Sequence, residues 1–508
     1  MPEYLSPGVY VEEIKISAKP IEGVSTSTAG FLGETERGPT LPSRLPITSW
    51  LEFQRVYGGY FGVDKYLPYA VEGFFRNGGQ RCYIARITKK TAKAAEFALK
   101  AGPVNAIKVV AIGEGSWGKR IAVKANKSSD GKTFKLSLFY WKELPSALYD
   151  PELNKAEDRD KPRPDFAEVF DNISIDESSP NFYGKTVNSK SNLIQVKPLN
   201  GAAKVPDCPI AYLAGETGVE SPVGLEDYTR TDMTTPGEKK GLTSFEDIDN
   251  ISIVYIPDTQ NTQDLYDVVV NHCEHLKDRF AIIDAKKGDP APKKPGDTKY
   301  AAVYYPWINI IDPRTGSKIL VPPGGHVAGI YARSDVERGV HKAPANEVIR
   351  GVDSLEFPVN KGKQDMLNPQ GINCIRVLGG RGIRVWGART LSTDPLWKYV
   401  NIRRLFLYLE ESIEEGTQWV VFEPNNEKLW DRVKQTISQF LTRVWKEGAL
   451  MGTTLEEAFF VKCDRTTMTQ DDIDNGRLIV LIGVAPVKPA EFVIFRIAQW
   501  AGGSSATE

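Results

Sequence analysis

The chain has few of the residues that build disulfide frameworks. Its 508 residues include only five cysteines, an odd number spread far apart in the sequence: Cys82, Cys208, Cys273, Cys374 and Cys463. This spacing provides neither a disulfide framework nor a CxxC pair. We therefore expect the protein to assemble in a reducing cytoplasm.

The chain also lacks an excess of charge of either sign and any long apolar run. Its 64 basic and 65 acidic side chains give a net charge of -1, so no overall attraction to nucleic acid or anionic lipid is built in. No stretch approaches the ~20 apolar residues of a membrane span. The N-terminal sequence MPEYLSPGVYVEEI has no basic patch followed by an apolar run. We therefore expect no nucleic-acid binding, no membrane insertion and no secretory signal.

Familiar catalytic and metal-binding motifs are missing too. The sequence contains no G-x-S-x-G elbow, no H-E-x-x-H pair and no catalytic carboxylate pair that can be singled out. His272, Cys273 and His275 lie together, but no second cluster completes the three or four ligands that zinc needs. No glycine and terminal glutamate occur together at the offsets of a calcium loop around Asp471, Asp472 and Asp474, so a solvated loop or helix cap explains them better. We expect no catalytic residue, cofactor or metal.

One segment resembles a phosphate-binding loop. GEGSWGK, at residues 113–119, matches G-x-x-x-x-G-K after the strand-like run VVAI. However, Arg120 stands where a serine or threonine would hold magnesium, and the following IAVKA alternates like a strand. Without a helix N-terminus, no set of backbone amides converges on the phosphates. We therefore favour a turn in a β-rich domain, with a nucleotide hydrolase that uses Lys119 as the alternative.

The overall composition, with 41% hydrophobic and 25% charged residues, is that of an ordinary folded protein. A chain of this length predicts about three domains. The expected fold class is α/β (an α+β multidomain chain), in which α/β core domains carry a β-rich insertion and an extended arm at each end. The boundaries follow from the local patterns: an N-terminal arm at 1–22, a middle α/β domain at 23–95 plus 241–345, an inserted β-rich outer domain at 96–240, a C-terminal inner α/β domain at 346–488, and a C-terminal arm strand at 489–508.

The middle domain alternates helices with nearly wholly apolar strands, which favours parallel pairing. Its expected elements are a helix at 67–75, strands at 82–87, 251–257, 280–284 and 300–310, and a helix at 263–279. In the C-terminal domain we expect a strand at 372–378, a helix introduced by Thr393, Asp394 and Pro395, and an amphipathic helix at 426–447. One apolar stripe runs along this last helix: Leu429, Trp430, Val433, Ile437, Phe440, Leu441, Val444 and Trp445.

The two ends of the chain carry short apolar strands. Val9, Tyr10 and Val11 form a β-prone run between Pro7-Gly8 and Pro20. Near the C-terminus both strand faces are apolar: Phe492 and Ile494 lie on one face, and Val493, Phe495 and Ile497 on the other. Such a strand needs cover on both sides. It can fold back onto its own domain or join the sheet of a neighbouring subunit, and the second choice generates rings or filaments.

The sequence resembles the tail sheath family of contractile phages and related extracellular injection systems. The similar segments are YLSPGVYVEE (4–13), YAVEGFFRNGGQRCYIARI (69–87), PPGGHVAGIYARSDVERGVHKAPAN (322–346), RGIRVWGARTL (381–391), NIRRLFLYLEESIEEGTQWVVFEPN (401–425) and PAEFVIFRI (489–497). GEGSWGKRI also resembles the Gly-x-Trp-Gly turn of these sheaths. The likeness spans nearly the whole chain, and the insertion is its least diagnostic part.

The resemblance implies a structural subunit that polymerises into stacked rings around an inner tube and contracts to drive that tube into a target, without an enzymatic step. It implies as partners the chain itself, an inner tube protein, baseplate and terminal cap proteins, with sister sheath subunits as a further option. The implied setting is a phage tail or a released extracellular particle assembled in the bacterial cytoplasm. The helix at 426–447 is the implied tube contact through Lys428, Arg432 or Lys434, although solvated positions of an amphipathic helix would look the same. A monomeric adhesin or carbohydrate-binding module built on the insertion is the third possibility.

Overall fold

The computed structural model describes residues 20–42, 45–153, 155–199, 204–215, 217–218, 222–230, 239–494 and 496. The chain forms two compact units, which we describe separately. The sheet unit comprises Gly23–Val340 and Pro344–Ser412, and the C-terminal unit contains the described residues of 1–22, 341–343 and 413–508. Both units combine helices with β-sheets, which confirms the expected α+β multidomain class.

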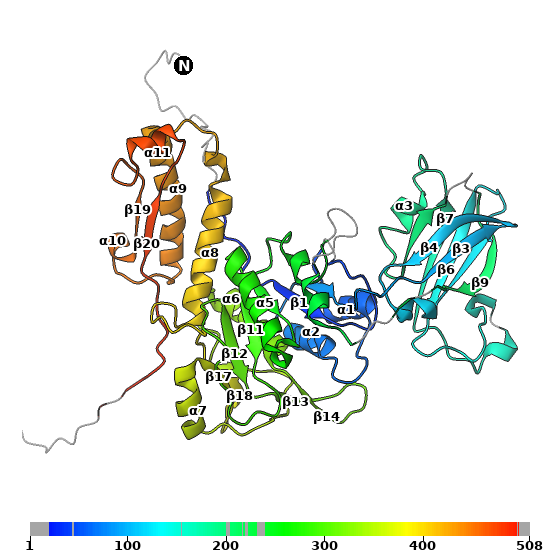
Figure 1. Cartoon of the computed structure of the whole chain (residues 1–508), viewed down its shortest axis with the longest axis horizontal. Helices are drawn as coiled ribbons and strands as arrows, with labels where there is room; N and C mark the ends of the chain where they lie inside the picture. The colour runs from blue at the N-terminus through cyan, green and yellow to red at the C-terminus, as the bar shows by residue number, and fades with distance from the viewer. Residues whose placement is uncertain are drawn as a thin grey trace, which may run out of the picture. The chain divides into compact units, whose positions relative to one another are not determined.

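An eight-stranded sheet forms the centre of the sheet unit (Figure 1), with the order β15-β18-β17-β12-β11-β10-β1-β2. Its strands are β1 (Ala29–Gly33), β2 (Cys82–Arg86), β10 (Ile253–Tyr255), β11 (Phe280–Asp284), β12 (Ala301–Tyr305), β15 (Glu347–Val348), β17 (Ile372–Leu378) and β18 (Gly382–Val385). The strands from β2 to β17 are parallel, and β18 and β15 continue the sheet in antiparallel pairings. Strands β1, β2, β10, β11 and β12 are fully buried, as their continuous apolar sequences predict.

Helices accompany this sheet: α1 (Trp50–Tyr57), α2 (Leu67–Arg76), α4 (Leu225–Thr229), α5 (Gln263–Leu276), α6 (Gly324–Arg338), α7 (Lys361–Leu367) and the first part of α8 (Val400–Gly416). Helix α2 packs against β1, and α6 packs against β10 and β11. The predicted helices at 67–75 and 263–279 are therefore confirmed, as is the parallel pairing of the strands on either side of α5.

The run predicted as one strand at 300–310 is divided at Pro306. Its first half is β12 of the large sheet. Its second half, β13 (Ile308–Ile311), belongs to a separate antiparallel sheet with β14 (Lys318–Val321) and β16 (Ser354–Leu355). Proline has no N–H to donate to a ladder, so a continuous apolar run can change sheets at this point.

The predicted domain boundary at residue 346 is wrong for the segment that follows it. β15, β17 and β18 join the large sheet, because β17 pairs in parallel with β12 through Val303 and Ile372. From Pro344 to Ser412 the chain belongs to the sheet unit, and it continues in the C-terminal unit from Ile413. The helix predicted to start near Thr393 begins instead at Val400, since residues 393–399 form a loop. Local patterns identified the strand at 372–378 but carry no information about its distant partner.

The β-rich insertion contains two antiparallel sheets. One has the order β3-β4-β8 and the other β7-β6-β5-β9. The strands are β3 (Glu96–Ala101), β4 (Val104–Ala111), β5 (Ile121–Lys127), β6 (Thr133–Tyr140), β7 (Phe166–Ser174), β8 (Ile194–Pro198) and β9 (Cys208–Tyr212), with the short helix α3 (Tyr183–Thr186). Their apolar sides meet in one core that includes Trp117, Phe134 and Leu136.

In the C-terminal unit, α9 (Glu427–Lys446) lies alongside the two-stranded ribbon β19 (Phe459–Lys462) and β20 (Leu481–Val484) (Figure 1). The short helices α10 (Leu455–Ala458) and α11 (Gln470–Asp474) complete it. Helix α9 begins at the predicted position, because the Asn426 side chain accepts a hydrogen bond from the Leu429 backbone N–H (3.1 Å). The predicted stripe is buried except for Trp445, which is half-buried.

Helices α2 and α6 approach so closely that glycine is required at their contact. A Cβ on Gly325 would lie 2.4 Å from the Ala70 Cα and 2.5 Å from its carbonyl oxygen. A Cβ on Gly329 would lie 2.4 Å from the Phe74 carbonyl oxygen. Because these neighbours are backbone atoms, they cannot move aside as a flexible side chain could.

A buried ion pair fixes α8 to the sheet unit. The Arg404 guanidinium donates to both carboxylate oxygens of Asp335 on α6, at 2.9 and 2.6 Å. Both side chains are only 3% exposed. Arg404 also donates to the Thr26 carbonyl oxygen (2.7 Å) and lies over the Tyr331 ring, 4.8 Å from its centroid. This bidentate geometry lets one arginine join α8, α6 and the segment that precedes β1.

We predict that Gly325→Ala lowers the free energy of unfolding by about 1–3 kcal/mol, because the added methyl group overpacks the contact between the helices. Gly362→Ala is the matched control. Gly362 is exposed on α7, where a Cβ would meet only the Asn360 side chain at 3.7 Å. Its substitution should raise stability by about 0.5–1 kcal/mol. Urea unfolding followed by tryptophan fluorescence measures both, and equal effects would refute the packing argument.

We predict that Arg404→Met costs about 3–5 kcal/mol, because Asp335 then loses its guanidinium partner in a buried position. The double variant Arg404→Met/Asp335→Leu should recover part of this loss, and a double-mutant cycle measures the coupling. Lys318→Met, which removes an exposed pair with Asp353 at 2.6 Å, is the control and should cost at most about 1 kcal/mol. A loss for Arg404→Met no larger than the control would contradict the assigned role.

Candidate assembly surface

The predicted C-terminal strand is only partly described, and its described part is exposed. Phe492, Val493 and Ile494 are 69%, 69% and 77% exposed and belong to no strand of the described residues. Phe495 and Ile497 lie outside the described residues, as do Val9, Tyr10 and Val11 of the N-terminal arm. The structure therefore places three large apolar side chains in solvent near the end of the chain.

The chain that leads to this segment is held by backbone hydrogen bonds. The Met451 N–H donates to the Ala485 carbonyl oxygen (2.7 Å), and the Val487 N–H donates to the Ala449 carbonyl oxygen (3.1 Å). These bonds fix Ala485 and Val487, the residues on either side of Pro486, and Val487 lies five residues before Phe492. The exposed segment therefore starts from a defined point beside β20.

The β19–β20 ribbon has only two strands within the described part of the chain. Its register runs from Phe459 opposite Val484 to Lys462 opposite Leu481. Phe460 and Leu481 are 47% and 53% exposed, although α9 covers part of the ribbon. A two-stranded ribbon is marginally stable alone, and backbone edges that are not paired can accept a further strand.

The three cationic residues suggested on α9 differ in their surroundings. Lys428 is exposed. The Arg432 guanidinium is half-buried and lies over the Trp419 ring, 4.5 Å from its centroid. The Lys434 ammonium pairs with Asp431 at 3.0 Å. Lys428 is therefore exposed, whereas Arg432 and Lys434 are half-buried and Arg432 also serves packing within the unit.

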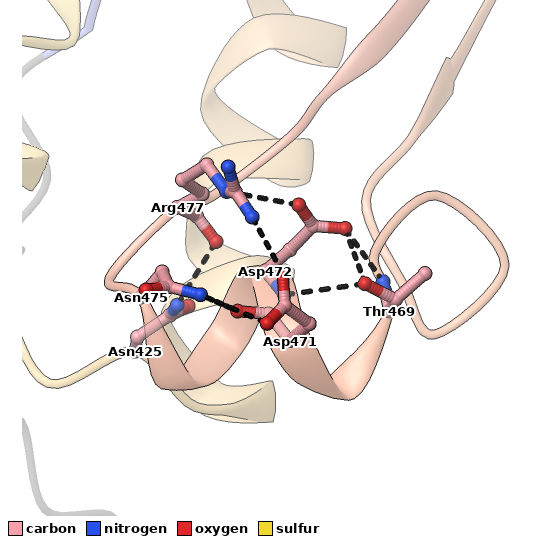
Figure 2. A network of polar contacts seen from close by, with 6 residues as sticks. All are labelled: Asn425, Thr469, Asp471, Asp472, Asn475 and Arg477. Atoms are coloured by element: carbon pink, nitrogen blue, oxygen red, sulfur yellow. Dashed lines mark hydrogen bonds and ion pairs between the residues drawn. The ribbon is translucent and has the colours of Figure 1, made fainter.

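The aspartates near residue 472 form a helix cap, as expected. Asp472 accepts hydrogen bonds from the backbone N–H (2.9 Å) and the hydroxyl (2.7 Å) of Thr469 at the start of α11. These bonds lower the pKa of Asp472. Figure 2 shows how Arg477 links the cap to its surroundings: its side chain bonds Asp471 and Asp472, and its carbonyl oxygen accepts from Asn425 (3.2 Å). The loop before β20 is thus tied to the turn before α9.

The segment that resembles a phosphate loop is a packing turn. Residues Ser116–Arg120 form a short 3-10 turn that leads into β5 rather than into a helix. A Cβ on Gly113 would lie 2.0 Å from the Gly38 carbonyl oxygen, so this glycine allows two backbones to touch. Glu114 accepts from the Thr40 hydroxyl (2.6 Å) and the Lys240 ammonium (2.5 Å). The glycines and the carboxylate serve contacts within the sheet unit, and Lys119 is exposed.

His272, Cys273 and His275 do not converge. Cys273 is buried in the core, whereas His275 is exposed, so the two point away from each other on α5. Burial lowers the pKa of His272 to about 3 and raises that of Cys273 to about 12. In the part of the chain that the structure describes, no group of three or more His, Cys, Asp or Glu side chains is placed to hold a metal ion. None of the described helices is long and apolar enough to cross a membrane.

Sequence reasoning missed one exposed apolar feature of the C-terminal unit. Val421 and Phe422, in the connection between α8 and α9, are 60% and 103% exposed. The available signal was an apolar dipeptide placed directly before Glu423 and Pro424, where a surface turn would be expected.

Comparison with known proteins places the chain among the tail sheaths. The model of the phage tail sheath protein central domain matches residues 226–391, and that of the phage tail sheath C-terminal domain matches residues 392–499. Together they cover more than half of the chain.

The tail sheath protein of Burkholderia phage BcepMu is 29% identical over 185 residues, which are 35% of this chain and 38% of that protein. A putative prophage major tail sheath protein of Pseudomonas aeruginosa is 25% identical over 228 residues, which are 41% of this chain and 57% of that protein. The chain thus spans less than two thirds of the length of these curated relatives.

Solved structures match over nearly the whole length. A chain of the anti-feeding prophage baseplate is 25% identical with a TM-score of 0.56, and the match covers 98% of this chain and 99% of that one. A chain of the contracted anti-feeding prophage helical sheath is 24% identical with a TM-score of 0.58 and has the same fold over 97% of this chain and 99% of that one. Family models, curated relatives and fold agree with the resemblance seen in the sequence, and the chain therefore belongs to the phage tail sheath family.

Proposed function

We propose that the chain is the structural sheath subunit of a contractile, phage-tail-like injection system. It polymerises into a helical tube around an inner tube and contracts to drive that tube into a target. Membership of the sheath family supports this role, as does the likeness to chains of contracted sheaths and of a baseplate. The role is mechanical rather than enzymatic, with the free energy stored in the extended lattice.

The observation that carries the proposal is the exposed segment Phe492–Ile494 next to a two-stranded ribbon. Three large side chains would gain ~1.5–3 kcal/mol each on burial, which is enough to offset much of the cost of ordering an arm. A strand from one subunit that joins the ribbon of the next would cover these side chains and pair backbone edges together.

Such a contact is heterologous, because the donated strand and the accepting ribbon are different surfaces of the same chain. Heterologous contacts close into rings or continue as helices, which is the geometry of a sheath. The N-terminal run Val9–Val11 would provide a second donated strand. Arms shared in this way would keep subunits connected while the folded units move as rigid bodies.

The further partners follow from the same role. An inner tube protein would contact α9, for which Lys428 is the best placed of the three candidates because it is exposed. Arg432 and Lys434 would contribute from the same helix. Baseplate and terminal cap proteins would bind the ends of the tube, and sister sheath subunits could share the lattice. The subunit would assemble in the bacterial cytoplasm and act as part of a phage tail or a released extracellular particle.

Substitution of Phe492, Val493 and Ile494 by serine should abolish tubes while leaving the melting temperature of the folded chain unchanged, because these side chains are exposed. The measurement is pelleting and negative-stain microscopy of the chain produced with the inner tube protein of its own particle. The matched control replaces Leu144, Leu153 and Val169, exposed apolar residues of the insertion, by serine. Normal tubes from the arm variant would rule out arm exchange.

A further inference from the structure

The turn before α9 presents an aromatic side chain at a backbone position that disfavours it. The Glu423 N–H donates to the Val420 carbonyl oxygen (3.1 Å), which closes a four-residue turn. Its second residue, Val421, has φ -64° and ψ 129°, and its third, Phe422, has φ 68°. These are the angles of a type II turn, whose third position favours glycine or asparagine because φ is positive. A bulky phenylalanine there costs free energy.

Packing of the Phe422 ring within the C-terminal unit does not offset this cost, because the side chain is fully exposed. The turn is nevertheless held firmly, since the Asn425 side chain accepts from the Trp430 indole (2.8 Å) and donates to the Arg477 carbonyl oxygen (3.2 Å; Figure 2). A strained, rigid and exposed aromatic residue is suited to anchor a partner.

Three glutamates lie near Phe422 in the sequence. Glu414 and Glu415 end α8, and Glu423 follows Phe422 directly. All three are exposed, and none forms an ion pair within the described residues. We call Glu414, Glu415, Val421, Phe422 and Glu423 the Phe422 turn. Its partner surface should combine apolar contact with positive charge.

The sheet unit carries a surface of this kind on the β17–β18 hairpin. Arg376 lies directly opposite Arg384 in the antiparallel pair, and Arg381 lies at the tip. Like charges directly opposite each other destabilise a sheet. We call Arg376, Arg381 and Arg384 the arginine hairpin.

Only neutral groups bind these three guanidinium groups within the described residues. Arg376 donates to the Val359 carbonyl oxygen (3.2 Å) and the Gln364 amide oxygen (2.8 Å). Arg381 and Arg384 donate to Asn346, at 3.0 and 2.6 Å. The hairpin therefore holds three positive charges close together without a carboxylate.

We propose that the Phe422 turn of one copy binds the arginine hairpin of a second copy. Each surface breaks a local rule of folding, and the three guanidinium groups are bound only by neutral groups of their own unit within the described residues. The charges of the two surfaces are complementary, three carboxylates against three guanidinium groups. Phe422 can lie over a guanidinium, an arrangement that attracts a cation to an aromatic face. The tip offers room, because a Cβ on Gly379, Gly380 or Gly382 would meet no atom within 4 Å.

This proposal rests on the proposed function only because it requires that copies of the chain polymerise. It does not depend on exchange of the arms. It joins the sheet unit of one copy to the C-terminal unit of another through side chains. Because the two surfaces differ, the contact is heterologous and can repeat along a helical lattice. Unlike a buried strand, it should weaken with salt.

Charge reversal on either side tests the proposal. Arg381→Glu/Arg384→Glu and, separately, Glu415→Arg/Glu423→Arg should each raise the concentration for half-maximal tube formation by about tenfold or more. Co-expression of these two variants should restore tubes, because alternating copies then juxtapose opposite charges at every contact. The control Arg159→Glu/Arg163→Glu reverses two exposed charges of the insertion and should assemble as the wild type does.

The outcomes separate the possibilities. Recovery only when all four reversals are in one chain would place the contact within a single copy and overturn the proposal, as would normal assembly of both double variants. If the serine variant of the arm still forms tubes, arm exchange fails while the charge-reversal test stands. If the wild-type chain itself forms no tubes with its tube partner, the sheath function fails.

A second variant checks the anchor itself. Phe422→Gly should leave the melting temperature equal or higher, because glycine suits the positive φ, yet weaken assembly by about tenfold. A purely structural role for Phe422 predicts the reverse, with a lower melting temperature and unchanged assembly.

Discussion

The buried ion pair of Arg404 and Asp335 fixes the position of α8 on the sheet unit. It joins α8 to α6 with two short hydrogen bonds, in a site where neither charge reaches water. A buried charge is tolerated only with its partner in place, so α8 has one position on the sheet unit. Helix α8 then continues past Ser412, and the elements proposed for assembly, namely α9, the β19–β20 ribbon and the C-terminal segment, all follow it along the chain.

Much of the fold could be predicted because it depends on local patterns. The alternation of β10, α5 and β11 and the stripe of α9 follow from hydrophobic periodicity, and the structure confirms them. The predictions that failed concern contacts between residues that are distant in the sequence. Residues 346–412 were assigned to the wrong domain because the pairing of Val303 with Ile372, and the contact of Arg404 with Asp335, join residues about 70 positions apart.

The candidate site was predictable to a similar degree and for similar reasons. Two apolar faces in Phe492–Ile497 suggested a strand that needs cover, and the described part of that segment is indeed uncovered in one chain. Sequence could not show that Phe422 has a positive φ or that Arg376 faces Arg384, because these are properties of backbone geometry and strand register. Both features oppose the stability of their own unit, which is why they point to contacts between copies.

Arm exchange is tested most directly by a helical reconstruction of the assembled tube from electron cryomicroscopy. With side chains resolved, Phe492–Ile494 should run as an added strand along the β19–β20 ribbon of a neighbouring subunit, with their side chains buried there. A reconstruction in which the segment returns to the ribbon of its own subunit, or stays exposed while the tube is intact, would contradict the proposed mechanism of assembly.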